Sequence, residues 1–148
     1  MRDYQHTQRG YATLALIGSS SLALVAIALA GDVGQEALAL GLAVALVLVL
    51  CFAWLTTTVR GGSLRIAFGI GLIHRTVRLS EIQACSVVRN PWYYGIGIHY
   101  TPHGWLYNVS GLRAVEVRLI GGKSFRVGTD EPEALCQAIM GARTGRLA

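Results

Sequence analysis

Two long stretches without a charged side chain constrain this chain more than any other feature of its sequence. The first covers 20 residues, Tyr11–Ala30, and the second covers 19, Ala37–Leu55. Each is close to the roughly 20 apolar residues that an α-helix needs to cross a hydrocarbon core of about 30 Å. Because backbone groups in lipid must be hydrogen-bonded within their own segment, we expect two membrane-spanning helices. The polar residues 31–36 between them predict a helical hairpin.

Small residues recur along both runs at a spacing of about one helical turn. Such residues let neighbouring helices approach closely in a membrane. An Ala- and Leu-rich segment also produces this spacing by chance, so both interpretations stay open. The candidate packing positions are Ser19, Ala23, Ala26 and Ala30 in the first run, and Gly41 and Ala45 in the second.

The first run also imitates a secretory signal peptide. Arg2 and Arg9 precede it, and Ala28-Leu29-Ala30 at its end resembles an A-x-A cleavage site. The apolar region of a signal peptide usually has about 7–15 residues, however, and this run is longer. Its length therefore favours a retained helix over a cleaved signal.

The distribution of basic residues predicts the orientation of the hairpin. Of 13 Lys and Arg residues, two precede the first run, none lies in residues 31–36, and 11 follow Leu55. Basic residues near helix ends mark the cytoplasmic side, so we expect both termini in the cytoplasm. The cysteines agree with a reducing compartment, since Cys51, Cys85 and Cys136 are odd in number and widely spaced.

After Leu55 the apolar pattern changes to the alternation that is typical of β-strands. Gly61-Gly62 and Gly121-Gly122 lie between strand-like segments and predict hairpin turns. The expected strands include residues 64–68, 73–79, 82–89 and 115–119, and a last one through Phe125 and Val127. We expect about six or seven short antiparallel strands in all.

One amphipathic helix follows the strands. Thr129 or Asp130 is suited to cap it, and Pro132 is tolerated in its first turn. Four apolar positions at i, i+3, i+4 and i+7 form a single stripe. They are Leu135, Ala138, Ile139 and Ala142. We expect this stripe to cover the open end of the sheet.

The second part of the chain resembles a bacterial pleckstrin-homology-like (PH-like) domain. The similarity lies in the ending Val115–Ile139, in the early segments 68–73 and 79–82, and in the middle segments 89–92, 95–98 and 108–111. Small bacterial membrane proteins pair two transmembrane helices with such a domain. The resemblance implies a seven-stranded, partly open barrel capped by one helix, with no catalytic residues. It implies little about a ligand, because fold alone does not define function.

These observations divide the chain into three parts. Residues 1–10 are expected to be a cytoplasmic tail, residues 11–55 the transmembrane hairpin, and residues 56–148 a cytoplasmic α+β PH-like domain. The resemblance and the topology together place the protein in a bacterial inner membrane.

Aromatic residues gather in one stretch of the predicted domain. Half of the chain's 12 aromatic side chains lie within residues 92–107, and no acid occurs between Glu81 and Glu116. Trp and Tyr combine an apolar body with a polar edge, which suits protein interfaces and the headgroup layer of a membrane. Alternatively, these rings fill the core. The candidate binding residues are Arg89, Trp92, Tyr94, Trp105 and Tyr107.

The predicted domain is basic, with a net charge of +6 from 11 Lys and Arg against five acids. A tethered basic domain is attracted to anionic lipid. Its arginines are scattered along the sequence, and no motif for binding nucleic acid accompanies them. We therefore expect anionic lipid as a possible ligand and no nucleic acid.

The sequence offers no support for catalysis, a metal site or a cofactor. His99 and His103 lie in a predicted turn, without further ligands at metal-binding spacing. Gly95-Ile96-Gly97 lacks the strand–loop–helix context of a dinucleotide site, and Ser110 lies in no nucleophile-elbow motif.

The expected function is therefore non-catalytic binding of a partner protein at the membrane. Two alternatives remain, recognition of anionic lipid headgroups and a structural role in a larger membrane complex. Association of several copies of the chain is compatible with each of these functions.

Overall fold

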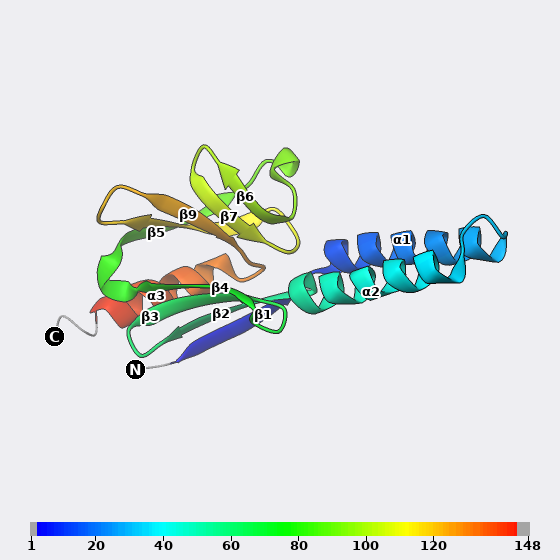
Figure 1. Ribbon diagram of the computed structural model, residues 1–148. Coiled ribbons are helices and arrows are strands. Elements are labelled where there is room, and N and C mark those ends of the chain that lie inside the picture. Colours follow the sequence, from blue (N-terminus) through cyan, green and yellow to red (C-terminus); the bar gives the residue numbers. More distant parts are fainter. Residues whose placement is uncertain (1–2, 145–148) are drawn as a thin grey trace.

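A computed structural model describes residues 3–144 of the chain. Arg2 and the residues after Thr144 lie outside this range. A pair of helices projects from one end of a β-rich domain (Figure 1). These helices are α1 (Tyr11–Leu29) and α2 (Gln35–Phe52). With mean hydropathies of 2.1 and 2.2, both are long and apolar enough to cross a membrane.

An antiparallel sheet and a mixed sheet form the domain. The first has the order β1-β2-β3-β4 and the second β5-β8-β9-β7-β6. The strands of the first sheet are β1 (Tyr4–Arg9), β2 (Trp54–Arg60), β3 (Ser63–Phe68) and β4 (Ile73–Arg78). Those of the second are β5 (Ile82–Arg89), β6 (Gly97–Thr101), β7 (Gly104–Asn108), β8 (Arg113–Leu119) and β9 (Ser124–Gly128). Short 3-10 turns, η1 (Leu79–Glu81) and η2 (Trp92–Tyr94), precede β5 and β6.

The expectation of a seven-stranded, partly open barrel is corrected by the strand arrangement. Within residues 3–144 there are nine strands rather than about seven, and the two sheets do not close into a barrel. Not all pairs are antiparallel, because β7 runs parallel to β9. The β6–β7 hairpin leaves the chain between β5 and β8, yet it docks on the free edge of β9. Gly104 permits this, since a Cβ there would lie 1.9 Å from the Ser124 carbonyl oxygen.

Residues expected to form a tail are part of the first sheet. Residues 4–9 form β1, which pairs with β2 along its whole length. The helical hairpin explains this pairing, because it returns the chain to its starting point. The Gly10 N–H donates to the Ala53 carbonyl 2.7 Å away, where the two helices meet the sheet. For the same reason Trp54 and Leu55, expected to end the second helix, begin β2 instead.

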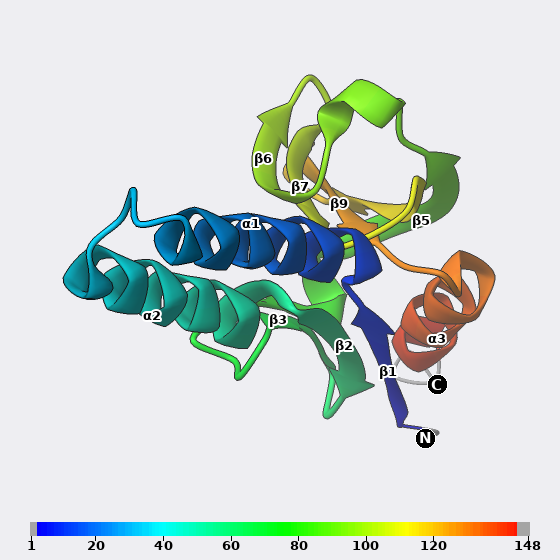
Figure 2. The ribbon, with the colours of Figure 1, turned by 90° about the vertical axis from the view of Figure 1, so that its right-hand side faces the viewer.

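The C-terminal helix α3 (Pro132–Thr144) lies where it was expected. It packs against β5, β8, η1 and β2 and so covers an open end between the sheets (Figure 2). Leu135 and Ile139 are fully buried, and Ala138 and Ala142 pack beside them, which confirms the predicted stripe. The Thr129 hydroxyl accepts a hydrogen bond from the Glu131 N–H, 3.1 Å away, just before the helix begins.

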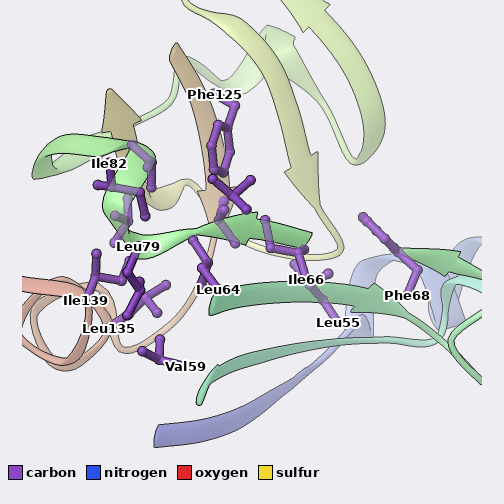
Figure 3. Packing of buried hydrophobic residues seen from close by; sticks show 14 of the residues in the cluster. Leu55, Val59, Leu64, Ile66, Phe68, Leu79, Ile82, Phe125, Leu135 and Ile139 are labelled. Carbon is purple, nitrogen blue, oxygen red and sulfur yellow. The ribbon is translucent and has the colours of Figure 1, made fainter. Parts of the chain in front are cut away.

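The core lies between the two sheets and extends beneath α3. Figure 3 shows side chains from the first sheet, such as Leu64 and Ile66, directed toward Phe125 of the second. Each of these three side chains is fully buried. The alternating pattern of β3, in which Leu64, Ile66 and Phe68 are buried and Arg65 is exposed, confirms the alternation seen in the sequence.

Several polar contacts fix the helical pair to the domain. The Ile70 N–H donates to the Leu50 carbonyl at 3.0 Å, and the Thr13 hydroxyl donates to the Val109 carbonyl at 3.1 Å. Gly69 lies so close to α2 that a Cβ would be 1.9 Å from the Leu50 carbonyl oxygen. The end of α2 and the β3–β4 loop are therefore in direct contact.

Candidate binding surface

The aromatic stretch is divided among three environments. Tyr107 is half-buried between the sheets, where its ring contacts Phe68 and Phe125 at centroid distances of 6.3 Å each. Tyr107 therefore belongs to the core, which was the alternative left open for it. It is not available as a surface contact without disturbing that packing.

Arg75 is associated with Tyr107, and sequence reasoning did not single it out. Its Nη1 donates to the Tyr107 hydroxyl at 3.1 Å, and its guanidinium carbon lies 4.3 Å from the centroid of the Phe125 ring. A cation over an aromatic face is attracted by the ring quadrupole. The sequence signal for this contact was the alternation of residues 73–79, which places Arg75 on the same strand face as Ile73 and Val77.

Tyr100 and Trp105 form an exposed pair on the β6–β7 hairpin. They lie opposite each other in register, and their rings meet edge to face at 5.5 Å. Tyr100 is 74% exposed and Trp105 46% exposed. β6 is an edge strand, so its outer backbone groups have no strand partner among the described residues. Aromatic surface and a free strand edge therefore occur together.

A second exposed group lies in η2. Trp92 is 80% exposed and Tyr93 is 67% exposed, whereas Tyr94 is half-buried. The three rings contact one another in sequence, with centroid distances of 6.0 and 5.2 Å. Arg89 is exposed at the end of β5. The structure thus keeps Trp92 and Trp105 on the surface, while Tyr94 and Tyr107 are partly covered.

The segment between η2 and β6 lies beside the helices. A mainly apolar cavity of about 360 Å³ is lined from the domain by Ile96, Gly97, Ile98, Asn108 and Val109. Its remaining lining comes from the first turns of α1 and the last turns of α2. The residues that follow η2, from Ile96 to Ile98, therefore border the ends of the two apolar helices.

A charged pair is enclosed within the second sheet. Nε and Nη2 of Arg126 lie 2.9 and 2.8 Å from Oε2 of Glu116. Nη1 of the same arginine donates to the Asn90 side-chain oxygen at 3.0 Å. The side chains of Arg126 and Glu116 are only 8% and 13% exposed. The pair connects β8, β9 and the end of β5, and neither residue was predicted to have a structural role.

Only part of the predicted helix-packing set lies between the helices. Gly41 faces α1 so closely that a Cβ would be 2.3 Å from Cδ2 of Leu24. Ala45 lines a groove between the helices with Gly41 and Leu24. The other four positions, Ser19, Ala23, Ala26 and Ala30, are exposed and do not line this groove. The spacing alone did not distinguish the two sides of α1.

Two of the cysteines are neighbours in the fold. Cys85 in β5 and Cys136 in α3 interact with each other, although 50 residues of sequence separate them. Burial, and then the contact with Cys136, raises the pKa of the Cys85 thiol. A thiol in this state is a poor nucleophile at neutral pH.

Within residues 3–144 no group of three or more His, Cys, Asp or Glu side chains is suited to hold a metal ion.

β1 contacts the beginning of α3 through two side chains. Nε2 of His6 lies 2.6 Å from Oδ1 of Asp130. The pKa of Tyr4 is raised to about 12, mainly by burial and then by the charges of Glu131 and Asp130. Its hydroxyl has no hydrogen-bond partner among the described residues.

We expect this tyrosine to make the protein less stable at alkaline pH. The unfolded chain loses the Tyr4 proton near pH 10, whereas the folded protein keeps it to about pH 12. The stability is therefore present below pH 10 and falls as the pH rises from 10 toward 12. Absorbance at 295 nm should record one late-titrating tyrosine, absent from Tyr4→Phe. If every tyrosine titrates near pH 10 in the folded protein, Tyr4 is solvated and the expectation is wrong.

No protein-family model and no curated protein matches this chain. Its function is therefore inferred from the geometry of these surfaces.

Proposed function

We propose that this chain is a membrane-anchored, non-catalytic module that binds a partner protein. In this proposal α1 and α2 span the inner membrane of a bacterium, and the domain lies on the cytoplasmic side. The anchor confines the domain to the membrane surface and so raises its effective concentration for a partner located there. The basic residues that flank the helices support this orientation.

The strand arrangement supports a PH-like domain with an added hairpin. Without β6 and β7, the sheets have four and three strands, followed by α3 at an open end. Seven strands and one terminal helix are what the resemblance implies. In this interpretation the β6–β7 hairpin is an insertion into the connection between β5 and β8.

The observation that carries the binding proposal is the exposed aromatic pair on this hairpin. Tyr100 and Trp105 are held in register by the strands and in contact through their rings. Rigid, exposed Trp and Tyr side chains are the residue types that contribute most strongly to protein interfaces. The free edge of β6 adds backbone donors and acceptors with which a partner strand could pair.

The test is alanine substitution at this pair in the full chain. Crosslinking and mild-detergent purification of the wild type should first yield a stoichiometric partner. Trp105→Ala and Tyr100→Ala should then weaken its binding by about tenfold or more each, as expected for a hot-spot residue. The thermal midpoint should stay nearly unchanged, because substitutions at exposed positions usually change stability by about 0.5 kcal/mol or less.

Ile120→Ala is the matched control, since Ile120 is 66% exposed in the β8–β9 turn. It should leave binding unchanged. If the two aromatic variants bind the partner as tightly as this control does, the hairpin is not the docking surface. If both variants unfold the domain, the pair is structural and the proposal fails in the same way.

Contact with the lipid surface is a second candidate function, favoured by the position of η2. Trp92 and Tyr93 are exposed beside a segment that shares a cavity with α1 and α2. At that level they would lie among the headgroups, where Trp and Tyr are enriched. Tryptophan fluorescence of Trp92 that shifts to shorter wavelength in vesicles would support this function. An unchanged spectrum, compared with a Trp92→Phe reference, would count against it.

A further inference from the structure

The four-stranded sheet has one face that no other element covers. It is the face turned away from the second sheet, and none of its outward side chains is buried. Every strand contributes at least one basic group to it. We call it the basic face and define it by Arg9, Arg60, Arg65, His74 and Arg78. Between these residues lie hydroxyl side chains, namely Thr7, Thr56, Thr58, Ser63 and Thr76.

The positive charge of the basic face is largely uncompensated. Asp3 lies 3.1 Å from Nε of Arg60, but Arg65 and Arg78 form no ion pair with any described residue. Two arginines of the second sheet differ in this respect. Arg113 pairs with Glu133, and Arg126 pairs with Glu116. The basic face therefore presents free guanidinium groups on a rigid sheet, and it is complementary to an acidic surface.

The strands of the first sheet extend away from the helices, so most of the basic face lies at a distance from the membrane. β1 leads into α1, β2 begins directly after α2, and β1 runs roughly along the helices in Figure 1. The strands therefore run away from the membrane surface, and the basic face does not lie flat on it. Arg60 ends the seven-residue β2, which at about 3.3 Å per residue places it roughly 20 Å from the membrane end.

Because of this distance, the anionic lipid of the same membrane is not the main ligand of the basic face. The potential of charged lipid decays within about 8 Å at physiological ionic strength. Arg9 and Trp54, at the membrane end, are within its reach, but Arg60 and Arg78 are not.

A single-stranded nucleic acid is also poorly matched to the basic face. Such ligands stack their bases on aromatic rings, and Trp54 is the one aromatic residue that the strand alternation directs outward on this face.

We propose that the basic face binds an acidic segment of a protein held near the same membrane surface. Arginines pair with carboxylates through short, charge-assisted hydrogen bonds, and the threonine hydroxyls supply further donors between them. β-Branched threonines have restricted side-chain rotation, so little entropy is lost on binding. This inference goes beyond the proposed function, because it uses a surface separate from the aromatic hairpin.

The experiment uses the full chain in nanodiscs of phosphatidylcholine, which carries no net charge. The probe is a fluorescent 20-residue peptide of alternating Glu and Ser, and binding is measured by anisotropy. Arg65→Gln/Arg78→Gln should weaken binding by about tenfold or more, in line with the coupling of close charge pairs. The matched variant Arg118→Gln/Lys123→Gln removes the same charge from exposed positions in β8 and in the β8–β9 turn. It should weaken binding less than about twofold.

A second variant tests the location without removing an arginine. Thr76→Glu places a carboxylate opposite Arg65 and should also weaken peptide binding, with the thermal midpoint of the domain unchanged. Trp105→Ala should leave peptide binding unchanged, which separates this result from the outcome for the aromatic hairpin.

Three results would overturn the proposal. Equal losses in the two matched variants would mean that net charge alone attracts the peptide. Tighter binding of a single-stranded oligonucleotide, lost in Arg65→Gln/Arg78→Gln, would assign the face to nucleic acid. Binding of phosphatidylglycerol vesicles but not of the peptide, weakened by the same variant, would assign it to lipid.

Discussion

Replacing Glu116 by leucine should lower the free energy of unfolding by about 3–5 kcal/mol, the cost of leaving one partner of a buried ion pair alone. Its carboxylate accepts a hydrogen bond from Nε of Arg126 and forms an ion pair with Nη2 of the same side chain, which is 8% exposed. Without it, the guanidinium keeps, among residues 3–144, only its hydrogen bond to the Asn90 side-chain oxygen at 3.0 Å. For a domain of this size the thermal midpoint should fall by more than about 10 °C. Thermal unfolding followed by near-ultraviolet circular dichroism measures this change.

Two further variants test the cause of this loss. Glu116→Leu/Arg126→Met removes both charges and should restore most of the stability, since an apolar pair often replaces a buried ion pair at little cost. Arg118→Gln is the matched control, because Arg118 is 60% exposed and lies 3.8 Å from the other Glu116 oxygen. It should change stability by less than about 1 kcal/mol. If Glu116→Leu costs no more than this control, the pair is solvated and its structural role is refuted.

Phe125→Ala should destabilise the domain by a similar amount, about 3–5 kcal/mol. The Phe125 ring is fully buried between the sheets, where it contacts Tyr107 and lies 4.3 Å from the Arg75 guanidinium carbon. Its loss would leave a cavity and remove a support of Arg75. Chemical denaturation of the full chain in detergent, followed by the same circular dichroism signal, measures the effect.

Ile120→Ala again serves as the control, because it removes apolar atoms from an exposed position. Its effect on stability should be within about 0.5 kcal/mol. A loss in Phe125→Ala as small as that of Ile120→Ala would contradict the assignment of Phe125 to a packed core.

The local elements of this protein were largely predictable. Residues 82–89 were expected as a strand and form β5 with those bounds. The stripe from Leu135 to Ala142 was expected to cover the sheet and does so. Both rest on the period of apolar residues, which depends only on neighbours in sequence. The N-terminal segment escaped prediction because its inward side chains, Tyr4, His6 and Gln8, are mostly polar.

The candidate surface was predictable as a composition but not as a geometry. The sequence located the aromatic stretch, yet it did not distinguish Trp105, on the surface, from Tyr107, two residues later in the same strand and against the core. Residues two positions apart in a strand direct their side chains to the same face. What separates them is that Tyr107 lies deeper between the sheets, beside Phe68 of β3. That neighbour is 39 residues away in sequence.

By itself, the sequence determined the two apolar helices, most of the strands and the amphipathic helix, because hydrophobic periodicity and turn residues act locally. Only the tertiary structure decided that β1 joins the first sheet, that β7 runs parallel to β9, and that arginines from four strands share one open face. Each of these depends on which strand lies beside which. Strand neighbours are chosen by the packing of the whole chain, through contacts between residues far apart in sequence, and no local pattern encodes that choice.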